Sequence, residues 1–160
     1  MLSYPAPFGK INRDAQAYAF TAAQARYGLE RKDWAAAAAL EPRLSEQFPW
    51  ESSHAPYVAL TRFPRGLGLA HRNRFKEAEI EAATLEEIRN QIDARSPYWA
   101  TQVEIQRLGV LASILYLSGG ADGGISRMRE AARLEASTEK SPLIIFAYLS
   151  RRCISTCVAQ

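Results

Sequence analysis

Residues 34–40 read WAAAAAL, one tryptophan followed by five alanines and a leucine. Alanine is the best helix former but buries little apolar surface, so this stretch predicts a helix that adds little bulk to a core. Helices approach to the short end of their packing distance only where their side chains are small. Asp33 is a suitable N-cap, because its carboxylate accepts hydrogen bonds from the first free N–H groups. We therefore expect a helix held between two neighbours with Ala37 at the contact, whereas helix propensity alone explains Ala35 and Ala39 equally well.

Helical patterns continue on both sides of this stretch. Residues 13–31 are rich in helix formers, and residues 74–95 place apolar side chains three and four positions apart. Residues 98–118 are apolar on more than one side, which predicts a helix covered on two faces. No alternation of period two runs for long, so we expect no strand. The sequence predicts an all-α domain over 1–140, made of three antiparallel helical hairpins at about 13–48, 55–95 and 97–139.

Several local features refine this outline. Pro42 and Pro64 fall inside helical stretches and are expected to kink them, while Pro97 suits a first helical turn. The glycine-rich run 119–124 is expected to be the turn of the third hairpin. One face of 74–95 is polar and expected to be solvated; it carries Glu77, Glu81, Glu86, Glu87 and Arg89. Residues 141–160 differ in composition and predict either a C-terminal capping helix or a non-native tail.

The three hairpins share a pattern when they are aligned just after each tight turn, on Trp34, Phe75 and Ala121. Small residues then recur at matched positions, three after the anchor and nine before it. They are Ala37, Ala78 and Gly124, and Ala25, Gly66 and Ala112. A small residue on each helix, facing the other, is what a close crossing requires. We therefore expect backbones to touch at these points in each hairpin.

This order of small residue, tight turn, aromatic residue and alanine resembles the tetratricopeptide repeat (TPR). The matching residues in the three hairpins are Ala25, Trp34 and Ala37; Gly66, Leu69, Phe75 and Ala78; and Leu111, Ala112, Leu115, Gly119, Gly124, Met128 and Ala131. The chain departs from the TPR pattern in its spacing of 41 and 46 residues, against about 34, and in Gln24, Gly28 and Arg65. The later hairpins also resemble a segment of longer bacterial TPR proteins of unassigned function, which implies that the chain is a piece of a longer array.

The resemblance implies an α-solenoid that binds a protein or peptide without catalysis, in a concave groove lined by the first helix of each hairpin. It places six side chains in that groove: Arg26, Phe63, Leu67, Gln106, Ser113 and Tyr116. Core packing explains Phe63 and Leu67 at least as well. Two other functions stay open, a homo-oligomerisation module and a small-ligand or regulatory helical domain of a larger protein.

Composition argues against several other classes. The net charge of +3 comes from basic residues that are scattered among acidic ones, so we expect no nucleic-acid partner. No signal peptide and no apolar stretch of membrane-spanning length is evident, which predicts a cytoplasmic protein without a membrane partner. His54 is expected in a loop and His71 at a helix end, as a surface or capping cation. Cys153 and Cys157 are too few ligands for a metal site. We expect no metal, no cofactor and no enzymatic activity.

Overall fold

Six α-helices make up the described part of the chain in a computed structural model, which covers residues 13–41, 54–92 and 94–138. The helices are α1 (Arg13–Glu30), α2 (Trp34–Ala38), α3 (Ala55–His71), α4 (Phe75–Ile92), α5 (Pro97–Leu117) and α6 (Ala121–Ser137). These ranges contain no strand, so the all-α prediction is confirmed for them. The predicted C-terminal helix or tail at 141–160 lies outside the described residues.

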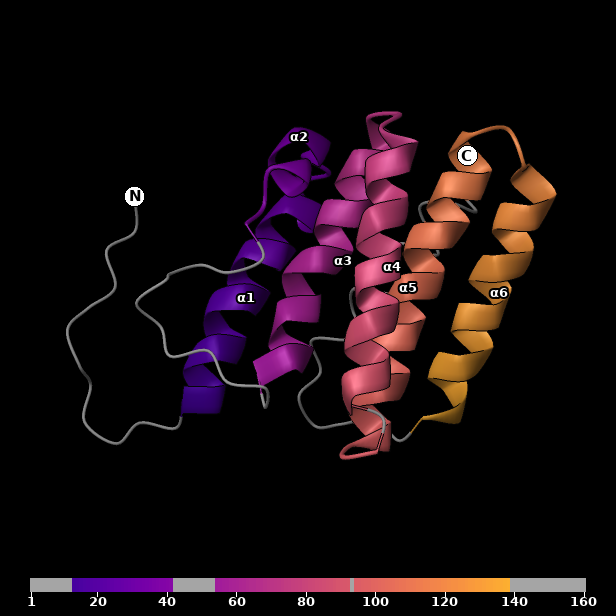
Figure 1. The fold of residues 1–160 in the computed structure, drawn as a ribbon. Helices are drawn as coiled ribbons and strands as arrows, with labels where there is room; N and C mark the ends of the chain where they lie inside the picture. Colours follow the sequence, from indigo (N-terminus) through magenta and orange to yellow (C-terminus); the bar gives the residue numbers. More distant parts are fainter. Residues whose placement is uncertain (1–12, 42–53, 93, 139–160) are drawn as a thin grey trace.

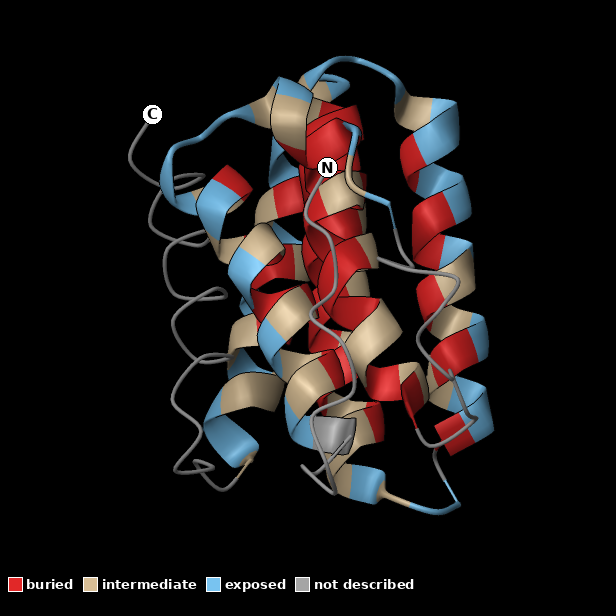
Figure 2. Ribbon diagram, turned by 90° about the vertical axis from the view of Figure 1, so that its left-hand side faces the viewer, coloured by how far each residue is buried: buried red, intermediate tan, exposed pale blue. Residues whose placement is uncertain are grey.

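The helices pack side by side from α1 at one end to α6 at the other (Figure 1). α3 contacts α1, α2, α4 and α5, and α5 contacts α3, α4 and α6. As predicted, α5 is apolar on more than one side because neighbouring helices cover it on more than one side. Buried residues gather toward the middle of the stack and exposed ones lie on its outside (Figure 2).

The turns inside the three hairpins have the same structure. Each contains one residue with positive φ, namely Lys32 (φ 53°), Asn73 (φ 59°) and Gly119 (φ 99°). The next amide donates to the carbonyl five residues back: Asp33 to Gly28 at 3.0 Å, Arg74 to Leu69 at 2.9 Å, and Gly120 to Leu115 at 2.9 Å. This is the Schellman arrangement that ends many helices. It recurs at the same 41- and 46-residue spacing as the sequence pattern.

Of these three left-handed residues, Lys32 is the least suited to its conformation. Glycine adopts positive φ without penalty and asparagine tolerates it, but a lysine side chain is strained there. Lys32→Gly is therefore expected to raise the free energy of unfolding by about 1 kcal/mol. Chemical denaturation would measure this. Lys32→Ala is the matched control and should give no such gain, because it keeps the Cβ; an equal gain would attribute the effect to loss of the lysine charge.

Small residues lie where the helices come closest, as the alignment predicted. Ala37 is fully buried, and a Cβ added to Gly28 would lie 3.4 Å from the Cβ of Ala37. A Cβ on Gly68 of α3 would lie 2.5 Å from the amide nitrogen of Ala38. The alanine stretch is therefore held between α1 and α3, which explains why Ala37 is small. Its N-terminus is also as predicted, because the Asp33 carboxylate accepts a 2.9 Å hydrogen bond from the amide of Ala36.

The close contacts of the second and third hairpins involve different partners. A Cβ on Gly66 would lie 2.9 Å from Val110 of α5, and Ala78 is fully buried. A Cβ on Gly124 of α6 would lie 2.8 Å from the amide nitrogen of Tyr116 on α5. Ala25 and Ala112 are also buried, while the aromatic anchors Trp34 and Phe75 are partly buried and pack against the core. The matched position in α3 thus meets a side chain of the next hairpin, and the one in α6 meets the backbone of its own partner helix. Contact between the paired small residues within each hairpin stays a prediction.

The structure differs from the sequence prediction at some helix ends. The second helix of the first hairpin, α2, ends at Ala38, and Ala39 is its C-cap. The predicted kink at Pro42 lies outside the described residues. By contrast, α3 continues past Pro64 to His71, as the apolar pattern indicated, and the kink at Pro64 stays a prediction. The glycine-rich run is a turn only in its first part, since α6 begins at Ala121 and includes Gly123 and Gly124. Pro97 occupies the first position of α5, as predicted.

Candidate binding surface

The first helices of the three hairpins, α1, α3 and α5, carry one continuous row of aromatic rings. The Tyr18 and Tyr57 ring centroids lie 6.1 Å apart at an interplanar angle of 74°. Those of Tyr57 and Trp99 lie 5.9 Å apart at 79°. Both contacts are edge-to-face, a favoured geometry for aromatic pairs. We call Tyr18, Tyr57 and Trp99 the aromatic row.

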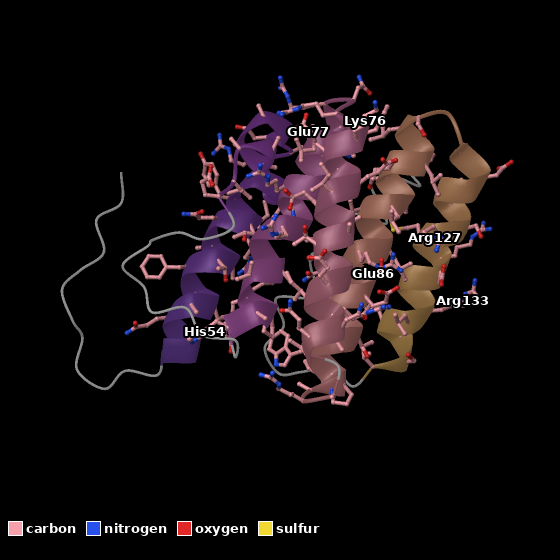
Figure 3. The ribbon with its side chains drawn as sticks, in the orientation of Figure 1. His54, Lys76, Glu77, Glu86, Arg127 and Arg133 are labelled. Carbon is pink, nitrogen blue, oxygen red and sulfur yellow. The ribbon has the colours of Figure 1, made fainter. Side chains whose placement is uncertain are left out.

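Further rings extend the aromatic row at the N-terminal ends of α3 and α5. The His54 ring lies 6.1 Å from Tyr57, and the Tyr98 ring lies 5.6 Å from Trp99. The row itself is partly buried, and burial raises the pKa of the Tyr18 hydroxyl above its ordinary value. Figure 3 shows His54 at the start of α3. Partly buried tyrosine and tryptophan side chains with a polar edge are the residue types that dominate protein-binding surfaces.

Sequence reasoning did not identify the aromatic row. Its members are 39 and 42 residues apart, close to the hairpin spacing, so a search for aromatic residues at the hairpin period would have found them. The alignment concentrated on the turns and the small residues. It therefore overlooked the opposite ends of the first helices.

The six predicted groove residues differ in accessibility. Four of them, Phe63, Leu67, Gln106 and Ser113, are buried. Tyr116 is partly buried, and its backbone nitrogen lies against the position of Gly124 on α6. Arg26 is half-exposed and pairs with Glu30 at 3.5 Å along α1. Of the six, only Arg26 is substantially accessible.

One face of α5 carries buried polar side chains among apolar neighbours. Gln102, Gln106 and Ser113 follow at spacings of four and seven residues, so they lie on one stripe of the helix. The Ser113 hydroxyl donates to the Gly109 carbonyl at 2.9 Å. Gln106 is 5% exposed, and among the described residues its amide has no hydrogen-bond partner at either the nitrogen or the oxygen. An unpartnered buried amide costs about 1–3 kcal/mol per group.

Ion pairs join α4 to the helices on either side of it. Glu81 is only 4% exposed and lies 2.9 Å from Arg62 and 3.0 Å from Arg65, both on α3. The prediction of a solvated Glu81 is therefore wrong, because two arginines from the preceding helix compensate its burial. At the other side, Arg89 of α4 lies 3.0 Å from Glu104 of α5, and Glu104 also pairs with Arg107 at 2.7 Å.

Glu77 and Glu87 of the predicted polar face are exposed. Figure 3 shows Glu77 and Glu86 on α4, and Arg127 and Arg133 on α6. No group of three His, Cys, Asp or Glu side chains that could hold a metal lies within 13–41, 54–92 and 94–138. Cys153 and Cys157 are outside these ranges. No helix of the described chain has the length and apolar character to cross a bilayer.

His71 lies at a helix end as predicted, whereas His54 does not lie exposed in a loop. His54 is buried at the N-cap of α3 rather than exposed in a loop. His71 lies in the last turn of α3 and stacks on Trp34 of α2, with ring centroids 3.8 Å apart and planes within 5°. Burial, and secondarily the charge of Lys32, lowers the pKa of His71 below its ordinary value of 6.5. A capping cation at His71 is therefore disfavoured at neutral pH.

The lowered pKa of His71 makes folding depend on pH. The unfolded chain takes up a proton at this site more readily than the folded one, so stability is lost as the pH falls through 6.5 toward the folded pKa. We expect a lower free energy of unfolding at pH 5.5 than at pH 7.5. His71→Phe, which can keep the stack on Trp34, should show a smaller slope in urea denaturation over this range; an unchanged slope would contradict the assignment.

Comparison of the chain with known protein families, curated proteins and solved structures found no match. The arrangement of the side chains is therefore the basis for a functional proposal.

Proposed function

We propose that this chain is a non-catalytic scaffold, similar to a TPR array, that binds a protein or peptide segment across α1, α3 and α5. The aromatic row carries the proposal. It runs over one helix from each hairpin, so a single extended segment could contact all three hairpins at once. Tyrosine and tryptophan provide large contact areas at a small cost in side-chain entropy.

The repeated construction supports the same proposal. Three hairpins with the same turn are the kind of element from which helical repeat arrays are built. In such arrays, first helices that lie beside one another form an extended surface. Here α3 contacts both α1 and α5, so the three first helices are adjacent. Arg26 is half-exposed on α1, and its charge acts on the pKa of the Tyr18 hydroxyl, so the two side chains are near each other. Arg26 would add a cation at one end of this surface.

A displayed library of random peptides tests the proposal. Peptides selected on the native chain are expected to lose at least about tenfold in affinity for Tyr57→Ala and for Trp99→Ala, the range typical of interface anchors. Tyr27→Ala is the matched control. Tyr27 is 60% exposed on α1 and does not belong to the aromatic row, so its removal should leave affinity unchanged.

Thermal denaturation of each variant separates binding from folding. We expect the loss of affinity in samples of each variant that are more than nine-tenths folded at the assay temperature. Selection of no peptide above background, or an equal loss of affinity for Tyr27→Ala, would contradict it.

A further inference from the structure

The first hairpin, formed by α1 and α2, is packed differently from the rest of the described chain. The buried side chains of α1 are all small: Ala17, Thr21, Ala22 and Ala25. The large side chains with almost no exposure come from other helices, and include Leu60, Leu67, Leu69, Leu85 and Leu108 of α3, α4 and α5. Because stabilisation by burial follows apolar area, the first hairpin gains less from packing than the other two.

The attachment of the first hairpin is confined mainly to one helix. Outside the hairpin itself, α1 and α2 have their main contacts with α3, whereas α4 packs on both α3 and α5. Among the described residues, these contacts include the Trp34–His71 stack, the close approach at Gly68, and a 2.8 Å hydrogen bond from Arg65 Nη1 to the Leu40 carbonyl. The Tyr18–Tyr57 pair adds a contact at the other end of α1.

The covalent connections follow the same division. The second hairpin is joined to the third by the four residues 93–96, whereas the sixteen residues 39–54 separate α2 from α3. A short connection keeps two hairpins together even when their contacts break.

We propose that the first hairpin opens from α3 as one cooperative unit while α3, α4, α5 and α6 stay folded. Opening removes α2 from Gly68 and Trp34 from His71, and so uncovers the surface of α3 that faced them. Helical repeat proteins gain stability from each hairpin and from each neighbour interface, so a weak end interface lets the end unit open alone. The inference concerns the packing of α1 and α2 and does not depend on the proposed binding function.

Native-state hydrogen exchange of the full chain, in the regime where exchange reports equilibrium opening, tests the proposal. Amides of α1 and α2 are expected to share one opening constant, at least about 100-fold larger than that of α4 and α5. They should also share one denaturant dependence, smaller than that of global unfolding, because opening exposes less surface. Independent opening of single amides without denaturant dependence would mean fraying and would overturn the proposal.

Two substitutions give opposite signatures and sharpen the test. Ile88→Val weakens the core of the second hairpin, in the open and the closed state alike. It should therefore accelerate exchange in α4 and α5 by about 3- to 10-fold and leave α1 and α2 unchanged. Trp34→Ala weakens only the closed state, so it should accelerate exchange in all four helices by the same factor.

The alternative is that the described chain opens only as a whole. Both variants would then accelerate every amide equally, α1 and α2 included. Equal acceleration of α1 and α2 by Ile88→Val would overturn the proposal.

Discussion

Replacing Gly68 by alanine is expected to lower the free energy of unfolding by about 3 kcal/mol, the upper part of the range for overpacked interiors. The new Cβ would lie 2.5 Å from the amide nitrogen of Ala38, 2.8 Å from the carbonyl oxygen of Trp34 and 2.9 Å from the carbonyl carbon of Ala37. All three neighbours are backbone atoms of α2, so no side chain can rotate away. The first hairpin would have to move from α3. Equilibrium denaturation in urea would measure the loss.

Gly123→Ala is the control for the Gly68 substitution, because it makes the same change in a helix without the close contact. The only atom near its new Cβ would be Leu115 Cδ1 at 3.9 Å, an ordinary contact distance. Alanine restricts the unfolded chain more than glycine, so this variant should gain up to about 1 kcal/mol. Equal effects of the two substitutions would show that the approach of α2 to α3 is looser than described.

Leu85→Ala is expected to cost about 3 kcal/mol, within the range measured for large-to-small changes in cores. Leu85 of α4 is completely buried in the cluster that joins α3, α4 and α5. Its truncation removes apolar burial and leaves a cavity that close-packed neighbours cannot fill. Leu115→Ala is the matched control. Leu115 is 37% exposed, so the same truncation should cost under about 1 kcal/mol. Similar melting temperatures for the two variants would contradict this assignment of the core.

The helices and their closest contacts could be predicted because both depend on local properties of the sequence. Gly124 is a glycine where an added Cβ would meet the backbone of α5, and Gly66 is one where it would meet the side chain of Val110. The alanines of α2 follow the same rule. Aligning the hairpins was enough to find these positions, since each turn imposes the same geometry on the residues around it.

Features that depend on distant partners could not be predicted in this way. Glu81 looks like part of a solvated face until Arg62 and Arg65 are placed beside it. His71 looks like a capping cation until Trp34 covers its ring. Each helix contributes one member of the aromatic row, and only the packing of α1, α3 and α5 brings these rings together. The predicted groove residues were assigned from the resemblance to the TPR pattern, which does not show how deeply a side chain of this chain is buried.

The shared turn has a consequence for how such a molecule could be lengthened. Lysine, asparagine and glycine all adopt the same left-handed bend in it, so the bend is imposed by the helices on either side rather than by one special amino acid. Each hairpin therefore contains the bend that joins its two helices and brings that bend with it when the hairpin is copied. Gene duplication or protein engineering could therefore add another hairpin without a new type of turn between its helices.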